Sequence, residues 1–180
     1  MITYLASKVS DLDILKAMKL LYFIDKHHLI RHGRPITGDT YYKLPYGPVP
    51  TLSYDLLKEA FDQSPIPDTE FPDRENLRNA IDIDRTTRYL IYKAKRDPNL
   101  NVFSETELAS VEEIVSKFGQ KSGLWLMNLS HRDCTFAKTL LNSQIDFYLF
   151  FEDEPHASRE AMELMELEQD DRDFVEGMQI

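Results

Sequence analysis

Residues 19–50 read KLLYFIDKHHLIRHGRPITGDTYYKLPYGPVP, and they join an apolar helical pattern to an aromatic loop that is rich in proline. The helical stripe begins before this stretch and continues into it through Ile14, Met18, Leu21, Ile24 and His28. Gly33 and Pro35 then predict that the helix ends at about His32, because glycine tolerates a positive φ and proline cannot extend a helix. The stretch therefore predicts a long helix followed by a stiff, extended loop.

The loop after this helix combines large rings with a restricted backbone. Its rings are Tyr41, Tyr42 and Tyr46, which lie between Gly38 and Gly47. Its prolines are Pro45, Pro48 and Pro50, each of which fixes φ and removes a backbone donor. Such rings can serve recognition at little entropic cost, although large rings are also often buried in a core. By strand alternation we expect Tyr42 and Lys43 to be exposed, and we expect Tyr46 and Pro48 to be mainly structural.

Further elements follow from periodicity and capping signals. The predicted helices are residues 2–9, about 11–32, 51–61, 105–118 and 122–130, and a capping box of Ser104 and Glu107 opens the fourth. Residues 137–151 are predicted to be helical, with a strand at 147–151 as the alternative, and a marginal terminal helix starts near Ser158. The predicted strands are 40–44 and 88–95, which we expect to pair with each other. The proline-rich residues 64–84 predict an irregular surface connection.

Together these elements predict a single α+β domain that is predominantly α-helical, with about six or seven helices and a small antiparallel β-sheet. A chain of 180 residues suffices for one such domain. We expect the domain to span residues 1–151, followed by an acidic C-terminal tail at 152–180 that is partly helical.

The negative charge of the chain is concentrated in this tail. Residues 152–180 contain eleven acidic residues and two arginines, a net charge of −9, which leaves −1 of the total of −10 for residues 1–151. A nearly neutral domain with an acidic tail suits the phosphate backbone poorly, so we do not expect nucleic acid as a direct partner. The tail itself is either solvated surface or a clamp for a basic partner.

Cys134 is the only cysteine, which excludes an internal disulfide and a cysteine-based zinc site and fits a reducing compartment. No stretch approaches the roughly 20 apolar residues of a membrane span, and the first residues lack the basic and apolar regions of a secretory signal. We therefore expect a cytoplasmic protein with no membrane association.

Asp25, His28 and His32 lie on one face of the predicted helix, at i, i+3 and i+7. Such a row could hold zinc or another divalent ion with a fourth ligand from elsewhere, so a metal-dependent enzyme centred on these residues is one alternative function. The other interpretation needs no metal, because Asp25 can pair with a neighbouring base and His32 is favoured at the negative end of the helix dipole. Since no second ligand-bearing element is evident, we predict neither a bound metal nor a cofactor.

His131, Asp133 and Cys134 lie close together in the sequence and raise the question of nucleophilic catalysis. Proximity in sequence is weak evidence, since such groups are assembled in space and the thiol needs an activating base or a helix N-terminus. Arg132 completes an HRD string, but the glycine-rich phosphate loop and the DFG motif of kinases do not accompany it. We therefore predict that the protein is not an enzyme and that His131 hydrogen-bonds the backbone at a helix end near Trp125.

Several motifs together resemble the Panacea domain, the SocA-like antitoxin family. They are KLLYFID at 19–25, GRPITGD at 33–39, YGPVP at 46–50 with the helix-like TLSYDLLKEAF after it, LASVEEIVSKFG at 108–119 and SGLWLMNLSH at 122–131. The most specific of them is YGPVP, and the next is the pair Ser130 and His131. The resemblance covers residues 2–151.

This resemblance implies a function in protein binding. Members of the family are mostly antitoxins of bacterial or prophage systems that neutralise a cognate toxin encoded alongside, usually by direct contact, while one member delivers its toxin to a bacterial protease. The implied partner is a protein toxin, with a protease as a second partner in the adaptor alternative. For partner binding we expect Tyr41, Tyr42, Lys43 and Tyr46. A structural role is expected for Gly38, Asp39, Gly47, Pro48, Trp125 and His131.

Overall fold

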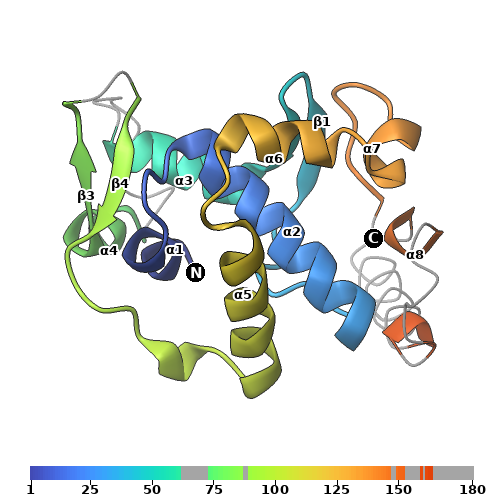
Figure 1. Ribbon diagram of the computed structural model, residues 1–180, viewed down its shortest axis with the longest axis horizontal. Coiled ribbons are helices and arrows are strands. Elements are labelled where there is room, and N and C mark those ends of the chain that lie inside the picture. Colours follow the sequence, from blue (N-terminus) through green and yellow to red (C-terminus); the bar gives the residue numbers. More distant parts are fainter. Residues whose placement is uncertain (62–72, 87–88, 147–148, 153–158, 160, 164–180) are drawn as a thin grey trace, which may run out of the picture.

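The computed structural model describes the chain except for residues 62–72, 87–88, 147–148, 153–158, 160 and 164–180 (Figure 1). The helices are α1 (Ile2–Lys8), α2 (Ile14–His32), α3 (Thr51–Phe61), α4 (Asp73–Ala80), η1 (Leu100–Val102, a 3-10 helix), α5 (Glu105–Phe118), α6 (Gly123–Ser130), α7 (Cys134–Lys138) and α8 (Leu149–Glu152). The strands are β1 (Tyr41–Leu44), β2 (Gly47–Pro50), β3 (Ile81–Asp84) and β4 (Ile91–Ala94). The prediction of a predominantly helical α+β fold is confirmed.

Helix α2 is the central element and crosses the molecule diagonally in Figure 1, with α5 and α6 packed against it. Asp13 caps its start by accepting a hydrogen bond from the backbone of Lys16 (2.7 Å), and Gly33 ends it with a φ of 78°. Eleven of its 19 residues are buried, so the helix is covered on several sides rather than along one stripe. This burial includes charged residues, and two of them organise the site described below.

Side-chain caps define the starts of α5 and α6. The hydroxyl of Ser104 accepts from the backbone of Glu107 (3.3 Å), and the carboxylate of Glu107 accepts from the backbone of Ser104 (2.8 Å), which confirms the predicted capping box of α5. Ser122 caps α6 by accepting from the backbone of Trp125 (3.2 Å). Both helices therefore begin where local sequence predicts, because the cap is formed by residues only three positions apart.

The described hydrophobic core has two parts. The larger cluster surrounds the first half of α2 and includes residues of α1, α4, α5 and α6. The smaller cluster joins α2 to β1 and α8. At its centre, the ring of Tyr22 lies 5.8 Å from the ring of Tyr41 and 5.6 Å from that of Phe150, measured between centroids. Each such buried ring contributes about 1.5–3 kcal/mol to folding, so the second cluster fixes β1 on α2.

Strands β1 and β2 form an antiparallel hairpin in which Tyr41 faces Pro50 and Leu44 faces Gly47. Two prolines remove backbone donors from β2, so β1 draws further hydrogen bonds from the segment after α7. Lys43 N–H donates to Ser143 (2.9 Å), and the carbonyl of Lys43 accepts from Asn142 (2.8 Å). Residues 142–145 thus run along β1 and hold the hairpin against the C-terminal part of the fold.

The predicted pairing of strands 40–44 and 88–95 is wrong. The second strand, observed as Ile91–Ala94, pairs antiparallel with Ile81–Asp84 in a separate two-stranded sheet. The predicted irregular connection at 64–84 is also wrong for residues 73–84, which form α4 and β3, while residues 62–72 lie outside the described part of the chain. Pairing between neighbouring strands closes a shorter loop and therefore loses less chain entropy than the predicted long-range pairing.

The predicted helix over residues 137–151 is also wrong. Helix α7 ends at Lys138, because Thr139 adopts an extended backbone (φ −73°, ψ 140°), and α8 starts only at Leu149. Between them, the backbone of Ile145 donates to the carbonyl of Tyr41 (2.8 Å). The tertiary hydrogen bonds to β1 thus replace helical ones, and the alternative of a strand at 147–151 fails at Leu149–Phe151, which are helical.

The C-terminal tail is described only in part, so the terminal helix predicted near Ser158 falls largely outside the described residues. Within the tail, Ala161 is buried and Met162 is exposed. No helix in the described part of the chain has the length and apolar character needed to cross a membrane.

Candidate functional site

Three separate motifs meet around the side chain of Lys19. This lysine lies in α2 with no exposed surface, and its Nζ donates a hydrogen bond to the backbone carbonyl of Pro48 in β2 (2.5 Å). Ser130, the last residue of α6, is equally buried, and its hydroxyl donates to the carbonyl of Met127 (2.8 Å). The hairpin therefore rests on a polar contact with the central helix rather than on apolar packing alone.

Gly47 closes over Lys19 and Ser130 in a way that only glycine permits. Its φ is 95°, a conformation that L side chains rarely adopt. A Cβ atom at this position would lie 2.8 Å from Oγ of Ser130 and 2.9 Å from Cε of Lys19. The close approach of YGPVP to KLLYFID and to the end of SGLWLMNLSH explains why these segments belong together in one fold.

Two titratable side chains beneath the hairpin have lowered pKa values. Burial lowers the pKa of Lys19 to about 7. The pKa of His131 is also lowered, first by burial and then by the charges of Lys19 and Lys43. Nε2 of His131 is buried and finds no hydrogen-bond partner within the described residues. His131 therefore contributes by packing, and its ring stacks on Phe136 with the centroids 4.4 Å apart.

Lys43 ties the hairpin to α7. Its Nζ donates to the carbonyls of Phe136 (2.6 Å) and Thr139 (2.8 Å) at the end of that helix. The same ammonium lies 4.4 Å from the centroid of the Phe136 ring, which adds a cation–π contact. Two lysines on different elements thus hold the hairpin from two sides, Lys19 from α2 and Lys43 through α7.

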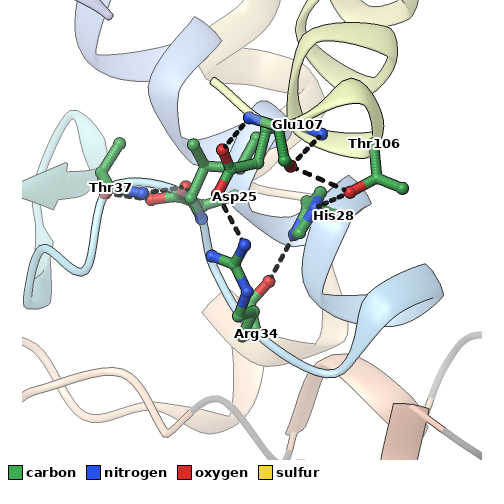
Figure 2. A network of polar contacts seen from close by, with 8 residues as sticks. Asp25, His28, Arg34, Thr37, Thr106 and Glu107 are labelled. Atoms are coloured by element: carbon green, nitrogen blue, oxygen red, sulfur yellow. Dashed lines mark hydrogen bonds and ion pairs between the residues drawn. The ribbon is translucent and has the colours of Figure 1, made fainter. Parts of the chain in front are cut away.

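Asp25 organises the loop that leads into the hairpin, as Figure 2 shows for part of its network. Its carboxylate accepts from the backbone of Ile36 (2.8 Å) and Thr37 (2.9 Å), from the Thr37 hydroxyl and from the Tyr41 hydroxyl (2.8 Å). Burial raises the pKa of Asp25, and the four hydrogen bonds oppose that rise. The expectation that Asp25 pairs with a neighbouring base is therefore wrong, because backbone and hydroxyl donors take that place.

Asp39, at the end of this loop, binds the start of the next helix. Its carboxylate accepts from the backbone N–H groups of Leu52 (3.0 Å) and Ser53 (2.8 Å), which are first-turn donors of α3. The GRPITGD segment is thus held in its middle by Asp25 and at its end by Asp39, which binds the first turn of α3.

The row of metal-capable side chains on α2, weighed as an alternative metal site, is divided among other partners (Figure 2). Nδ1–H of His28 donates to the carbonyl of Arg34 (2.7 Å), and its Nε2 faces the Thr106 hydroxyl (3.4 Å). His32 stacks on His28 at a centroid distance of 4.6 Å, and Asp25 is engaged as above. Within the described part of the chain, no three metal-capable side chains gather into one site.

Next to this network lies an open cavity of about 460 Å³ between α1, α3, α4 and α5. Thr37 and Glu107 lie at its border, and Glu107 also pairs with Arg34 (2.7 Å). The lining mixes apolar side chains with scattered polar ones, and the residues predicted for partner binding lie elsewhere.

The structure corrects several predictions about the hairpin. Tyr41 is completely buried and bonded to Asp25, so it offers no surface to a partner in this conformation. A mainly structural role was predicted for Tyr46, yet 69% of its surface is exposed at the tip of the hairpin. Tyr42 and Lys43 are half-buried rather than exposed. Alternation fails at Lys43 because its ammonium bonds to the carbonyls of Phe136 and Thr139 at the end of α7.

The residues predicted to have a structural role occupy different environments. Gly38 has a φ of 64° with open space around it, while Pro48 is buried and accepts the hydrogen bond of Lys19. Trp125 packs against Phe118 of α5 at 6.0 Å between centroids. His131 ends α6 through its backbone N–H, which donates to Met127 (3.0 Å), so the predicted backbone contact is made by its main chain and not by its ring.

Sequence reasoning did not identify Lys19, and it assigned Lys43 to partner binding and not to the support of the hairpin. A signal for Lys19 exists, since it interrupts an apolar run between Met18 and Leu20 on the buried side of a helix. Nothing local indicates the role of Lys43, because its acceptors are more than 90 residues away.

A family model described as the antitoxin SocA-like Panacea domain matches residues 17–136. The chain belongs to this family. The Panacea match begins in α2 and ends in α7, so it includes the Lys19 contact, the hairpin and the Asp25 network. Neither a curated protein nor a solved structure matches the chain.

Proposed function

We propose that this Panacea-domain protein is an antitoxin that neutralises a cognate protein toxin by binding it directly, without catalysing a reaction. The observation that carries the proposal is the family match over residues 17–136. The toxin is expected to be encoded beside this chain in a bacterial or prophage toxin–antitoxin system, with both proteins in the cytoplasm.

The hairpin supports a role in binding because it combines an exposed ring with a fixed backbone. Tyr46 projects from the tip, while Gly47 and Pro48 directly after it are buried. Lys19 and Lys43 hold the two strands through short hydrogen bonds to backbone carbonyls. A rigid aromatic tip loses little conformational entropy when a partner covers it, which favours affinity.

The polar groups of the site support binding rather than catalysis. Lys19 and Ser130 have no exposed surface, and Asp25 is 2% exposed. Each of them is engaged by backbone groups of the chain itself: Lys19 and Asp25 hold the hairpin and the loop before it, and Ser130 bonds within α6.

A co-expression experiment tests the proposal. The small reading frame beside this gene is expressed from an inducible promoter, and growth is compared with and without the full-length chain. We expect the reading frame to arrest growth, the chain to restore it, and the two purified proteins to form a complex. Adjacent reading frames that are harmless, or toxicity that the chain does not relieve, would contradict an antitoxin function.

The mode of neutralisation can be read from the same strains. Direct occlusion predicts that the toxin stays at a constant level while its activity is blocked, and that purified chain inhibits purified toxin alone. In the adaptor alternative, the toxin level falls when the chain is present, and the loss disappears in a strain that lacks the responsible protease.

A further inference from the structure

We propose that the toxin docks on one defined surface, formed by Tyr46, Leu124, Trp125, Leu140 and Leu141, and that it presents to this surface an apolar centre with an acidic rim. The inference rests on the proposed antitoxin function and deepens it. We call this surface the hairpin–α6 face.

Contacts place the elements that carry these side chains next to one another. A Cβ at Gly47 would touch Ser130, so the residue after Tyr46 lies against the end of α6. Asn142 donates to the carbonyl of Lys43, which places the loop after α7 beside the hairpin. Figure 1 shows α6, the hairpin and this loop along the upper edge of the molecule, with β3 and β4 at the far left.

The apolar side chains on this face are unusually exposed. Leu140 is 77% exposed, Tyr46 69%, and Leu124 60%, and Leu141 and Trp125 are also open to solvent. Single exposed apolar residues are normal on a protein surface, but a group of them on adjacent elements is typical of an interaction site. Tyrosine and tryptophan are also the residues that most often dominate binding energy.

The two stretches of chain that carry this face differ in net charge from the rest of the chain. Residues 40–50 and 120–144 contain the bases Lys43, Lys121, Arg132 and Lys138 and one acid, Asp133, a net charge of +3. The rest of the chain therefore carries −13, since the total is −10. Asp133 is itself paired with Lys26 (2.8 Å), so the acid on this stretch is neutralised.

Positive charge beside apolar side chains selects a partner with acidic residues around an apolar centre. Nucleic acid fits less well, because its binding needs many clustered bases, whereas this face exposes leucines such as Leu124, Leu140 and Leu141. Exposed bases at the edge of an interface accelerate association more than they slow dissociation, so the rim should act mainly on the rate of encounter.

Photo-crosslinking tests the location of the face. Tyr46→p-benzoylphenylalanine and Leu140→p-benzoylphenylalanine variants are each co-expressed with the adjacent toxin that the wild-type chain neutralises. The matched controls carry the same substitution at Tyr89 and Val102, which are 59% and 65% exposed and lie on other parts of the surface. We expect crosslinks to the toxin from positions 46 and 140 and none from the controls.

Substitutions then test its chemistry with the purified toxin. Leu140→Asp should weaken binding by about tenfold or more, and the circular dichroism and melting of the free chain should not change, since the side chain is solvated. The double variant Arg132→Glu with Lys138→Glu should slow association severalfold at low salt. Its control, Lys8→Glu with Lys58→Glu, makes the same charge change elsewhere and should have a clearly smaller effect.

The possible failures point to different conclusions. Crosslinks from Tyr89 or Val102 instead of positions 46 and 140, with growth still rescued, would overturn the hairpin–α6 face and leave the antitoxin function standing. Faster association of the Arg132 and Lys138 double variant would overturn the acidic rim alone. If the wild-type chain rescues no adjacent toxin, the proposed function fails, and this inference fails with it.

Discussion

Nζ of Lys19 donates to the carbonyl of Pro48 across 2.5 Å inside the fold, and this contact fastens the hairpin to the central helix. Burying a lysine costs free energy because its charge loses hydration. Here the buried Lys19 holds YGPVP in place. Lys19 and Pro48 are 29 positions apart, so the contact joins the KLLYFID and YGPVP motifs into one structural unit.

Gly47→Val should destabilise the whole domain, by about 1–3 kcal/mol or more, because it adds backbone strain and collides with Lys19 and Ser130. Gly38→Val is the matched control, since Gly38 also has a positive φ but has nothing within 4 Å of an added Cβ. Urea unfolding of both variants measures the difference. Equal losses would mean that backbone strain alone, and not the close approach, determines the effect.

The free energy of unfolding should depend on pH through Lys19. Its pKa is about 7 in the folded chain and near the ordinary value of 10.5 in the unfolded chain, so between these values the unfolded chain binds a proton that the folded chain does not. Stability should therefore rise with pH in this window, by at most about 1.4 kcal/mol per pH unit from this group.

The variant Lys19→Met isolates this contribution. It loses the hydrogen bond to Pro48, so its absolute stability is not the readout; the measured quantity is the slope of unfolding free energy between pH 7.5 and 9.5. The wild type should show a steeper rise than the variant, while effects of Met1 and Lys16, whose pKa values are also lowered by burial, cancel in the comparison. Parallel slopes would contradict a depressed pKa at Lys19.

Asp25→Asn should destabilise the fold by about 1–3 kcal/mol, because the amide cannot accept all four hydrogen bonds that the carboxylate receives. Asp39→Asn is a suitable comparison, since Asp39 accepts only two backbone N–H groups, one on each oxygen, so its amide loses one of these hydrogen bonds and not two. Thermal melting should rank the variants in this order. A larger loss at Asp39 would show that the start of α3, and not the loop network, limits stability.

Removing part of the acidic tail distinguishes two hypotheses about charge. Truncation after Glu163 removes six acidic residues and one arginine, a net charge of −5, and retains the buried Ala161. If the toxin carries an acidic rim, association should be as fast as before or faster at low salt. A clamp for a basic toxin predicts the opposite, with slower association and weaker salt dependence. Stopped-flow binding at two salt concentrations provides the comparison.

Local signals in the sequence were sufficient for the main helices. The cap at Ser104, the glycine at Gly33 and the periodic apolar residues between such points predicted α2, α3, α5 and α6 with nearly correct bounds. These signals work because a cap or a helical turn is satisfied by residues three or four positions apart. The family resemblance was likewise visible from short motifs, and the match over 17–136 confirms it.

Strand pairing was not determined by such signals. The strand character of Ile91–Ala94 was evident, but its partner Ile81–Asp84 lay in a stretch whose prolines suggested irregular structure. The segment after α7 looked helical, and it is extended where β1 offers it hydrogen bonds. In both cases the backbone groups found their partners through tertiary contacts, which override weak local propensity.

The sequence by itself determined the family, the helical framework and the motifs that belong to the site. Only the tertiary structure decided which side chains of those motifs are interior supports and which face solvent. Tyr41 is buried and Tyr46 exposed because Asp25 accepts the hydroxyl of the first while Gly47 turns the chain over Lys19 directly after the second. Those partners come from elements distant in the sequence, so their effect on each tyrosine depends on the assembled core and cannot be read from the loop alone.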